Sequence, residues 1–96
     1  MMRSRALQLL AEHKGVLAQR FGVTSLALFG STVRDDARAD SDVDILVAFN
    51  GPATSERFFG VQFYLEDLLG RPVDLVTEKA LRPELRPHIE REAVRV

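Results

Sequence analysis

Cysteine is missing from this 96-residue chain, and so is tryptophan. Without cysteine there is no disulfide, no thiolate nucleophile and no thiolate zinc site. Long apolar runs are missing too: none approaches the ~18 residues of a membrane-spanning helix, and the N-terminal residues do not resemble a signal peptide. The formal net charge is only −1, whereas a protein that binds nucleic acid through its phosphates needs a basic surface. We therefore expect a cytoplasmic protein without membrane association or direct nucleic-acid binding.

The residues that are present have the composition of an ordinary globular domain. Hydrophobic residues make up 46% and charged residues 28% of the chain, so a core can form without disulfides or a structural metal. Hydrophobic periodicity predicts helices over residues 3–20, 55–69 and about 87–93, a short helix and loop within 31–40, and strands over 25–29, 42–49 and 72–77. Residues 1–96 are thus expected to form one α/β domain, with helices packed on one face of a small mixed sheet.

Acidic residues interrupt two of the expected strands. Asp42 and Asp44 open the second strand, and because side chains alternate faces along a strand, they point to the same side about 6.5–7 Å apart. Asp74 sits between apolar residues in the third strand and joins them if the two strands are neighbours. Carboxylates gathered on one face require a compensating cation. Oxygen ligands without histidine or cysteine favour Mg²⁺ or Mn²⁺, and two such ions are typical of phosphoryl or nucleotidyl transfer.

A Gly-Ser pair at the end of the first strand complements the acidic residues. Gly30 lets the backbone approach a bulky ligand, and the N–H groups of a short helix after it would point toward an anion. Ser31 adds a hydroxyl donor, and Arg34 adds a cation for a phosphate oxygen. A nucleoside triphosphate with bound Mg²⁺ suits both halves of such a site.

Each of these features has an ordinary structural explanation when it is taken alone. Gly-Ser is common turn chemistry, Ser-Asp can close a polar loop, Asp74 can be an exposed edge-strand residue, and Arg34 can be a solvated charge. The aromatic residues of the expected 55–69 helix (Phe58, Phe59, Phe63 and Tyr64) are interpreted as core rather than as a nucleotide-stacking surface. Glu92 and the charged residues around it are interpreted as a charged helix face or a partner surface. The features at fixed spacing, taken together, nevertheless favour a functional site.

The combined pattern G-S-x-x-R-x6-S-D-x-D runs unbroken from Gly30 to Asp44. It resembles the motif of the nucleotidyltransferase superfamily that includes DNA polymerase beta. With its short length, the chain is most similar to the minimal nucleotidyltransferases (MNT domains) of bacteria and archaea. The resemblance covers nearly the whole chain and implies a polymerase beta-like nucleotidyltransferase fold.

The resemblance also implies roles for individual residues. Asp42 and Asp44 match the carboxylates that hold the metal ions, and Asp74 matches a third carboxylate that orients or deprotonates the attacking hydroxyl. All three are therefore candidate catalytic residues and metal ligands.

Four further residues match the nucleotide-binding part of the motif. Gly30 and Ser31 correspond to the pair that binds the triphosphate, Arg34 occupies the basic position, and Ser41 precedes the first motif aspartate. The expected cofactors are Mg²⁺, with two ions and Mn²⁺ as a substitute, and the expected substrate is ATP.

MNT proteins similar to this chain act as antitoxins of HEPN-domain toxins, which are all-helical ribonucleases, and adenylylate a tyrosine of that partner. The resemblance thus implies transfer of AMP from ATP to a protein hydroxyl. Two alternatives stay open. The first is a binding-only antitoxin that masks its partner without catalysis. The second is a transferase acting on RNA or a small molecule, which needs binding surface that the sequence does not display.

Overall fold

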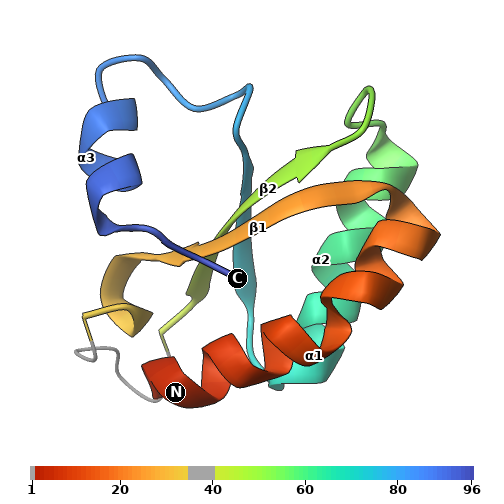
Figure 1. Ribbon diagram of the computed structural model, residues 1–96, viewed down its shortest axis with the longest axis horizontal. Helices are drawn as coiled ribbons and strands as arrows, with labels where there is room; N and C mark the ends of the chain where they lie inside the picture. Colours follow the sequence, from red (N-terminus) through yellow and green to blue (C-terminus); the bar gives the residue numbers. More distant parts are fainter. Residues whose placement is uncertain (1, 35–40) are drawn as a thin grey trace.

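The computed structural model describes residues 2–34 and 41–96, and its elements follow the predicted order (Figure 1). They are α1 (Arg3–Phe21), β1 (Val23–Phe29), the short 3-10 helix η1 (Gly30–Thr32), β2 (Val43–Phe49), α2 (Ser55–Leu69), β3 (Val73–Thr77), α3 (Arg86–Glu92) and β4 (Val94–Arg95). β4 is an addition to the sequence-based prediction. Residues 35–40 of the predicted helix and loop over 31–40 lie outside the described residues.

Local signals in the sequence set the ends of the two long helices. α1 is capped at its C-terminus by Gly22, which has a left-handed φ of 74° and donates its N–H to the Ala18 carbonyl at 3.0 Å. α2 is capped at its N-terminus by Thr54, whose hydroxyl accepts the Arg57 N–H at 3.2 Å, and it is followed by Gly70 with a φ of 68°. Within the described residues, neither of these helices nor α3 is both long and apolar enough to cross a membrane.

The strands form one mixed four-stranded sheet in the order β3-β2-β1-β4. β1 is antiparallel to both β2 and β4, whereas β2 and β3 are parallel and are joined through α2. The chain direction therefore places the end of β1 beside the beginnings of β2 and β3. The second and third predicted strands are therefore neighbours, which is the condition for Asp74 to join Asp42 and Asp44.

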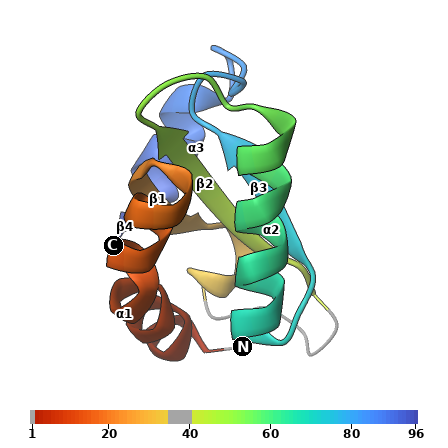
Figure 2. The ribbon, with the colours of Figure 1, turned by 90° about the vertical axis from the view of Figure 1, so that its right-hand side faces the viewer.

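α1 and α2 cover one face of the sheet, as the sequence predicted (Figure 2). Alternate residues of β2 point toward these helices, namely Val43, Ile45 and Val47, and each is at most 1% exposed. They pack with apolar residues of the helices and neighbouring strands, including Leu10, Leu17, Leu28 and Leu65, all of them completely buried. Burial of this apolar surface is the main source of the domain's stability.

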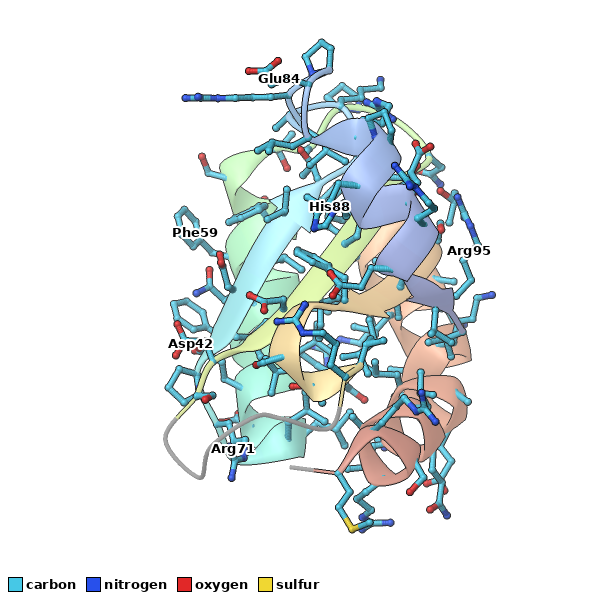
Figure 3. The ribbon with its side chains drawn as sticks, turned by 90° about the vertical axis from the view of Figure 1, so that its left-hand side faces the viewer. Asp42, Phe59, Arg71, Glu84, His88 and Arg95 are labelled. Carbon is cyan, nitrogen blue, oxygen red and sulfur yellow. The ribbon has the colours of Figure 1, made fainter. Side chains whose placement is uncertain are left out.

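α3 lies on the opposite face of the sheet, where Figure 3 shows it in front of the strands. A second, smaller apolar cluster holds it there. Ile89 and Ala93 pack against this cluster, whose buried members are Ala27, Phe29, Leu46 and Leu81. The C-terminal segment thus covers a small apolar cluster on this face of the sheet. The sequence predicted that the helices pack on one face of the sheet, which is correct for α1 and α2 but wrong for α3, because the apolar residues of β1 and β2 that face away from α1 and α2 form a cluster of their own.

The aromatic residues of α2 are divided between the core and the surface. Phe58 and Tyr64 pack against the main core, in agreement with the prediction. The prediction is wrong for Phe59 and Phe63, which are 49% and 61% exposed and stack on each other with ring centroids 6.3 Å apart. They are one helical turn apart and share the outward face of α2.

Candidate functional site

Asp44 and Asp74 lie opposite each other on the parallel strands β2 and β3. Neighbouring strands are only about 4.8 Å apart, which brings the two side chains within reach of each other. They share a side-chain hydrogen bond. Asp44 alternates with the buried Leu46, which packs in the α3 cluster, so these carboxylates belong to the sheet face that carries α3 rather than to the face that carries α1 and α2.

Two hydrogen bonds hold the beginning of β3 in register, one with β2 and one with α2. The Val43 N–H donates to the Pro72 carbonyl at 3.0 Å. The Val73 N–H donates to the Glu66 carboxylate of α2 at 3.0 Å, and Val73 itself is only 4% exposed. Asp74 follows directly, so α2 helps to place its side chain beside Asp44.

Asp42 immediately precedes β2 and is exposed at the margin of the sheet (Figure 3). Its charge acts on Asp44 together with that of Asp74. The structure therefore brings together the three acidic residues singled out in the sequence. Asp42 and Asp74 are exposed, while Asp44 between them is partly buried.

The pKa of the Asp44 carboxyl is raised from 3.8 to about 6. Partial burial is the largest cause, followed by the charge of Asp74, the hydrogen bond to Asp74, and the charges of Asp42 and Glu92. All of these disfavour the ionised form. A cation bound at this place would relieve the repulsion and restore the carboxylate.

The turn after β1 lies directly against Asp44. Gly30 begins the 3-10 helix η1 with a φ of 76°, a conformation that other residues adopt only with strain. A Cβ on Gly30 would overlap the Asp44 carboxylate and lie 2.9 Å from its Cγ. Glycine is thus required twice, for the backbone conformation and for the close approach. Ser31, half-buried in η1, follows this contact.

Glu92, at the end of α3, binds the same turn. Its Oε2 accepts the Gly30 N–H at 3.2 Å, and its Oε1 forms an ion pair with the Arg34 guanidinium. The sequence-based interpretation of Glu92 as a charged helix face or partner surface is therefore wrong. A signal was present: Glu92 follows Ile89 by three positions and so lies on the side of α3 that packs on the sheet.

Ser41 lies at the margin of this arrangement, where its carbonyl accepts a hydrogen bond from Arg71 at 3.4 Å. The structure thus gathers Gly30, Arg34, Asp44 and Asp74 at one end of the sheet. Ser41 is near them in sequence, but the contact described for it is made by its backbone carbonyl and not by its side chain.

The donor set suits a hard divalent cation, because it consists of carboxylate oxygens. Among the described residues, however, no group of three or more histidine or acidic side chains is arranged to hold a metal ion. Magnesium often binds through one or two carboxylates plus substrate phosphates, and two of these aspartates fit such a site.

Comparisons with known proteins bear on this arrangement. The profile of the nucleotidyltransferase domain family matches residues 10–96. Over 88 residues the chain is 44% identical to protein adenylyltransferase MntA of Thermococcus cleftensis, a match that covers 92% of this chain and 89% of that relative.

Two solved structures are also similar to this chain. A candidate minimal nucleotidyltransferase has 39% identity and a TM-score of 0.81, covering 98% of this chain and 95% of that one. A chain from the complex of a tri-AMPylated Shewanella oneidensis HEPN toxin with an MNT antitoxin has 18% identity and a TM-score of 0.60, covering 97% of this chain and 66% of that one. The second likeness is one of fold alone.

Proposed function

Because this chain belongs to the nucleotidyltransferase domain family, and is a nucleotidyltransferase of the minimal type, we propose that it transfers AMP from ATP to a hydroxyl group of a HEPN-domain toxin. The observation that carries the proposal is the convergence of three aspartates and a glycine turn at one end of the sheet. Phosphoryl chemistry of this kind depends on positioning and on charge stabilisation, and both are features of such a cluster.

The proposal assigns the metal to Asp42 and Asp44, with the nucleotide's phosphates completing its coordination. The oxygen donors and the raised pKa of Asp44 support this assignment, since the charges of three other acidic side chains (Asp74, Asp42 and Glu92) oppose the ionisation of Asp44. Bound Mg²⁺ would neutralise charge that develops on the α-phosphate and on the departing pyrophosphate.

The phosphate end of the proposed site is the turn at Gly30. Its backbone N–H and the guanidinium of Arg34 are donors that match phosphate oxygens, and both already bind a carboxylate in this structure. Ser31 would add a hydroxyl donor from the same turn.

Asp74 is the proposed base. It is exposed and hydrogen-bonded to Asp44, so an acceptor hydroxyl can approach it from solvent. In the reaction the acceptor oxygen bonds to the α-phosphorus of ATP, the bond to the bridging oxygen of pyrophosphate breaks, and the hydroxyl proton passes to Asp74.

The proposed acceptor is a protein because the relatives are named for that activity. The Thermococcus relative is called a protein adenylyltransferase, and the Shewanella complex contains an AMPylated HEPN toxin with an MNT antitoxin. A binding-only antitoxin is the alternative from a different class. The aspartate cluster supports catalysis instead, because carboxylates that repel one another have no evident role in a protein that only masks its partner.

The experiment incubates the protein with Mg²⁺, the product of its neighbouring gene and ATP labelled at either the α- or the γ-phosphate. We expect the partner to acquire the α-label but not the γ-label, and Asp42→Asn/Asp44→Asn to transfer neither. Asp67→Asn is the matched control, because Asp67 is an exposed carboxylate of α2 outside the cluster. An unlabelled partner that the double variant still neutralises would identify a binding-only antitoxin. Label on added RNA would identify the other alternative.

A further inference from the structure

Glu92 occupies the two donors that the proposed function assigns to phosphate. One carboxylate oxygen accepts the Gly30 N–H at 3.2 Å, and the other is paired with Arg34. The Glu92 side chain is only 17% exposed, although Arg34 on the outer side is 51% exposed. A carboxylate and a phosphate accept the same hydrogen bonds from a backbone N–H and a guanidinium, so the two groups compete for this place.

The fold holds Glu92 in this place from both sides. Before it, Ile89 of α3 packs in the apolar cluster on the sheet. After it, Val94 pairs with Leu28 in the β1–β4 ladder, and the Val96 N–H donates to the Leu26 carbonyl at 3.0 Å. The backbone at Glu92 is thus fixed relative to the turn, so it is rotation of the Glu92 side chain that vacates the Gly30 N–H.

The position is electrostatically unfavourable for a carboxylate apart from these contacts. Glu92 is one of the charges that raise the pKa of Asp44. Its attraction to Arg34 therefore holds it beside other acidic groups that repel it. A ligand that brings its own cation neutralises part of this repulsion among the acidic groups, and it can therefore displace the Glu92 carboxylate from its contacts.

We propose that Glu92 is an internal occupant of the phosphate subsite, which ATP must displace from Gly30 and Arg34 before it binds. The proposal rests on the proposed function, because it concerns the same subsite. Apparent affinity falls in proportion to the fraction of molecules in which the subsite is open. If the Glu92-bound form is about 90% populated, removal of this carboxylate strengthens nucleotide binding about tenfold.

The experiment measures binding of Mg²⁺–ATP to the whole chain by calorimetry. Glu92→Ala removes both contacts, whereas Glu92→Gln keeps an acceptor for the Gly30 N–H and loses the charge. We expect the dissociation constant to fall about tenfold for Glu92→Ala and by less for Glu92→Gln. Glu90→Ala is the matched control, since Glu90 lies on the same helix but is 53% exposed and pairs with Arg86. It should bind as the wild type does.

Two further measurements connect any gain to the phosphate subsite. Inorganic triphosphate with Mg²⁺ lacks a base and a sugar, so it should show the same gain. In an Arg34→Ala background the effect of Glu92→Ala should shrink, because the two residues act on one contact. Thermal unfolding of each variant verifies that it is folded.

The outcomes separate this inference from the proposed function. Tighter binding by folded Glu92→Ala supports the inference. Equal or weaker binding by this folded variant, with the wild type still binding Mg²⁺–ATP, overturns the inference and leaves the proposed function in place. Failure of every folded chain to bind Mg²⁺–ATP overturns both.

Discussion

Replacing Gly30 by alanine separates two reasons for glycine in the turn. The first is its φ of 76°, because a left-handed conformation costs an alanine roughly 1–2 kcal/mol. The second is space, because the added Cβ would overlap the Asp44 carboxylate and lie 3.2 Å from Asp44 Cβ. Asp44 Cβ is fixed to β2, so relief requires the Asp44 carboxylate to turn away from Gly30.

Gly70→Ala is the control for the first reason alone. Gly70 has a similar φ of 68°, but a Cβ built there meets no atom within 4 Å. We therefore expect Gly70→Ala to lose roughly 1–2 kcal/mol of stability, or about 4–8 °C in melting temperature for each kcal/mol. Gly30→Ala should lose that and about 1 kcal/mol more for the displaced side chain.

Binding distinguishes the two variants more sharply than stability does. With Asp44 turned away and the Gly30 N–H shifted, Gly30→Ala should bind Mg²⁺–ATP at least about tenfold more weakly than Gly70→Ala, the equivalent of one strong hydrogen bond. Calorimetric titration and thermal unfolding provide the two measurements. Equal nucleotide affinity in the two variants would refute the reasoning that the turn and Asp44 form one site.

Three further predictions concern charge and packing. For Asp44, a folded-state pKa of about 6 lies above its ordinary value of 3.8, so its stabilising contribution is full below about pH 4 and is lost as the pH rises through 6. Asp44→Asn should therefore raise the free energy of unfolding by about 1 kcal/mol at about pH 8, after allowance for solvent screening, and by less at about pH 4. Chemical denaturation at the two pH values tests this. A gain in stability found only at the acidic pH would contradict it. Glu66→Ala should cost about 1–3 kcal/mol in urea unfolding because the Val73 N–H loses its acceptor, and an unchanged midpoint would exclude that role. Leu65→Ala should lower the free energy of unfolding by about 2–5 kcal/mol and Phe63→Ala by less than about 0.5 kcal/mol, since Leu65 is fully buried and Phe63 is 61% exposed. Similar losses for the two variants in thermal unfolding would disprove the orientation of α2.

Periodic patterns made much of the fold predictable. The predicted helix over residues 55–69 has the bounds of α2, because a capping threonine precedes it and a glycine follows it. Alternation along β2 predicted that Asp42 and Asp44 share a face, and the parallel pairing of β2 with β3 then brought Asp74 to the same place.

Other features depend on contacts between distant segments, which periodicity does not encode. β4 has only two residues and exists because it pairs with β1. The apolar residues of α3 predict that it packs on something, but its packing on the face opposite α1 and α2 depends on the path of the preceding segment. The contact between Glu92 and Gly30 spans 62 positions in the chain and follows from that placement.

Intact-mass measurement of the partner tests the central claim most directly. The proposed HEPN-domain partner would be produced with the wild-type protein, with Asp42→Asn/Asp44→Asn, or with Asp67→Asn, and the mass of the partner would be compared among the three. We predict that the partner gains the mass of one or more AMP groups with the wild type and with Asp67→Asn, and none with the double variant. A partner that binds the wild type and keeps its unmodified mass in the presence of Mg²⁺ and ATP would contradict the account.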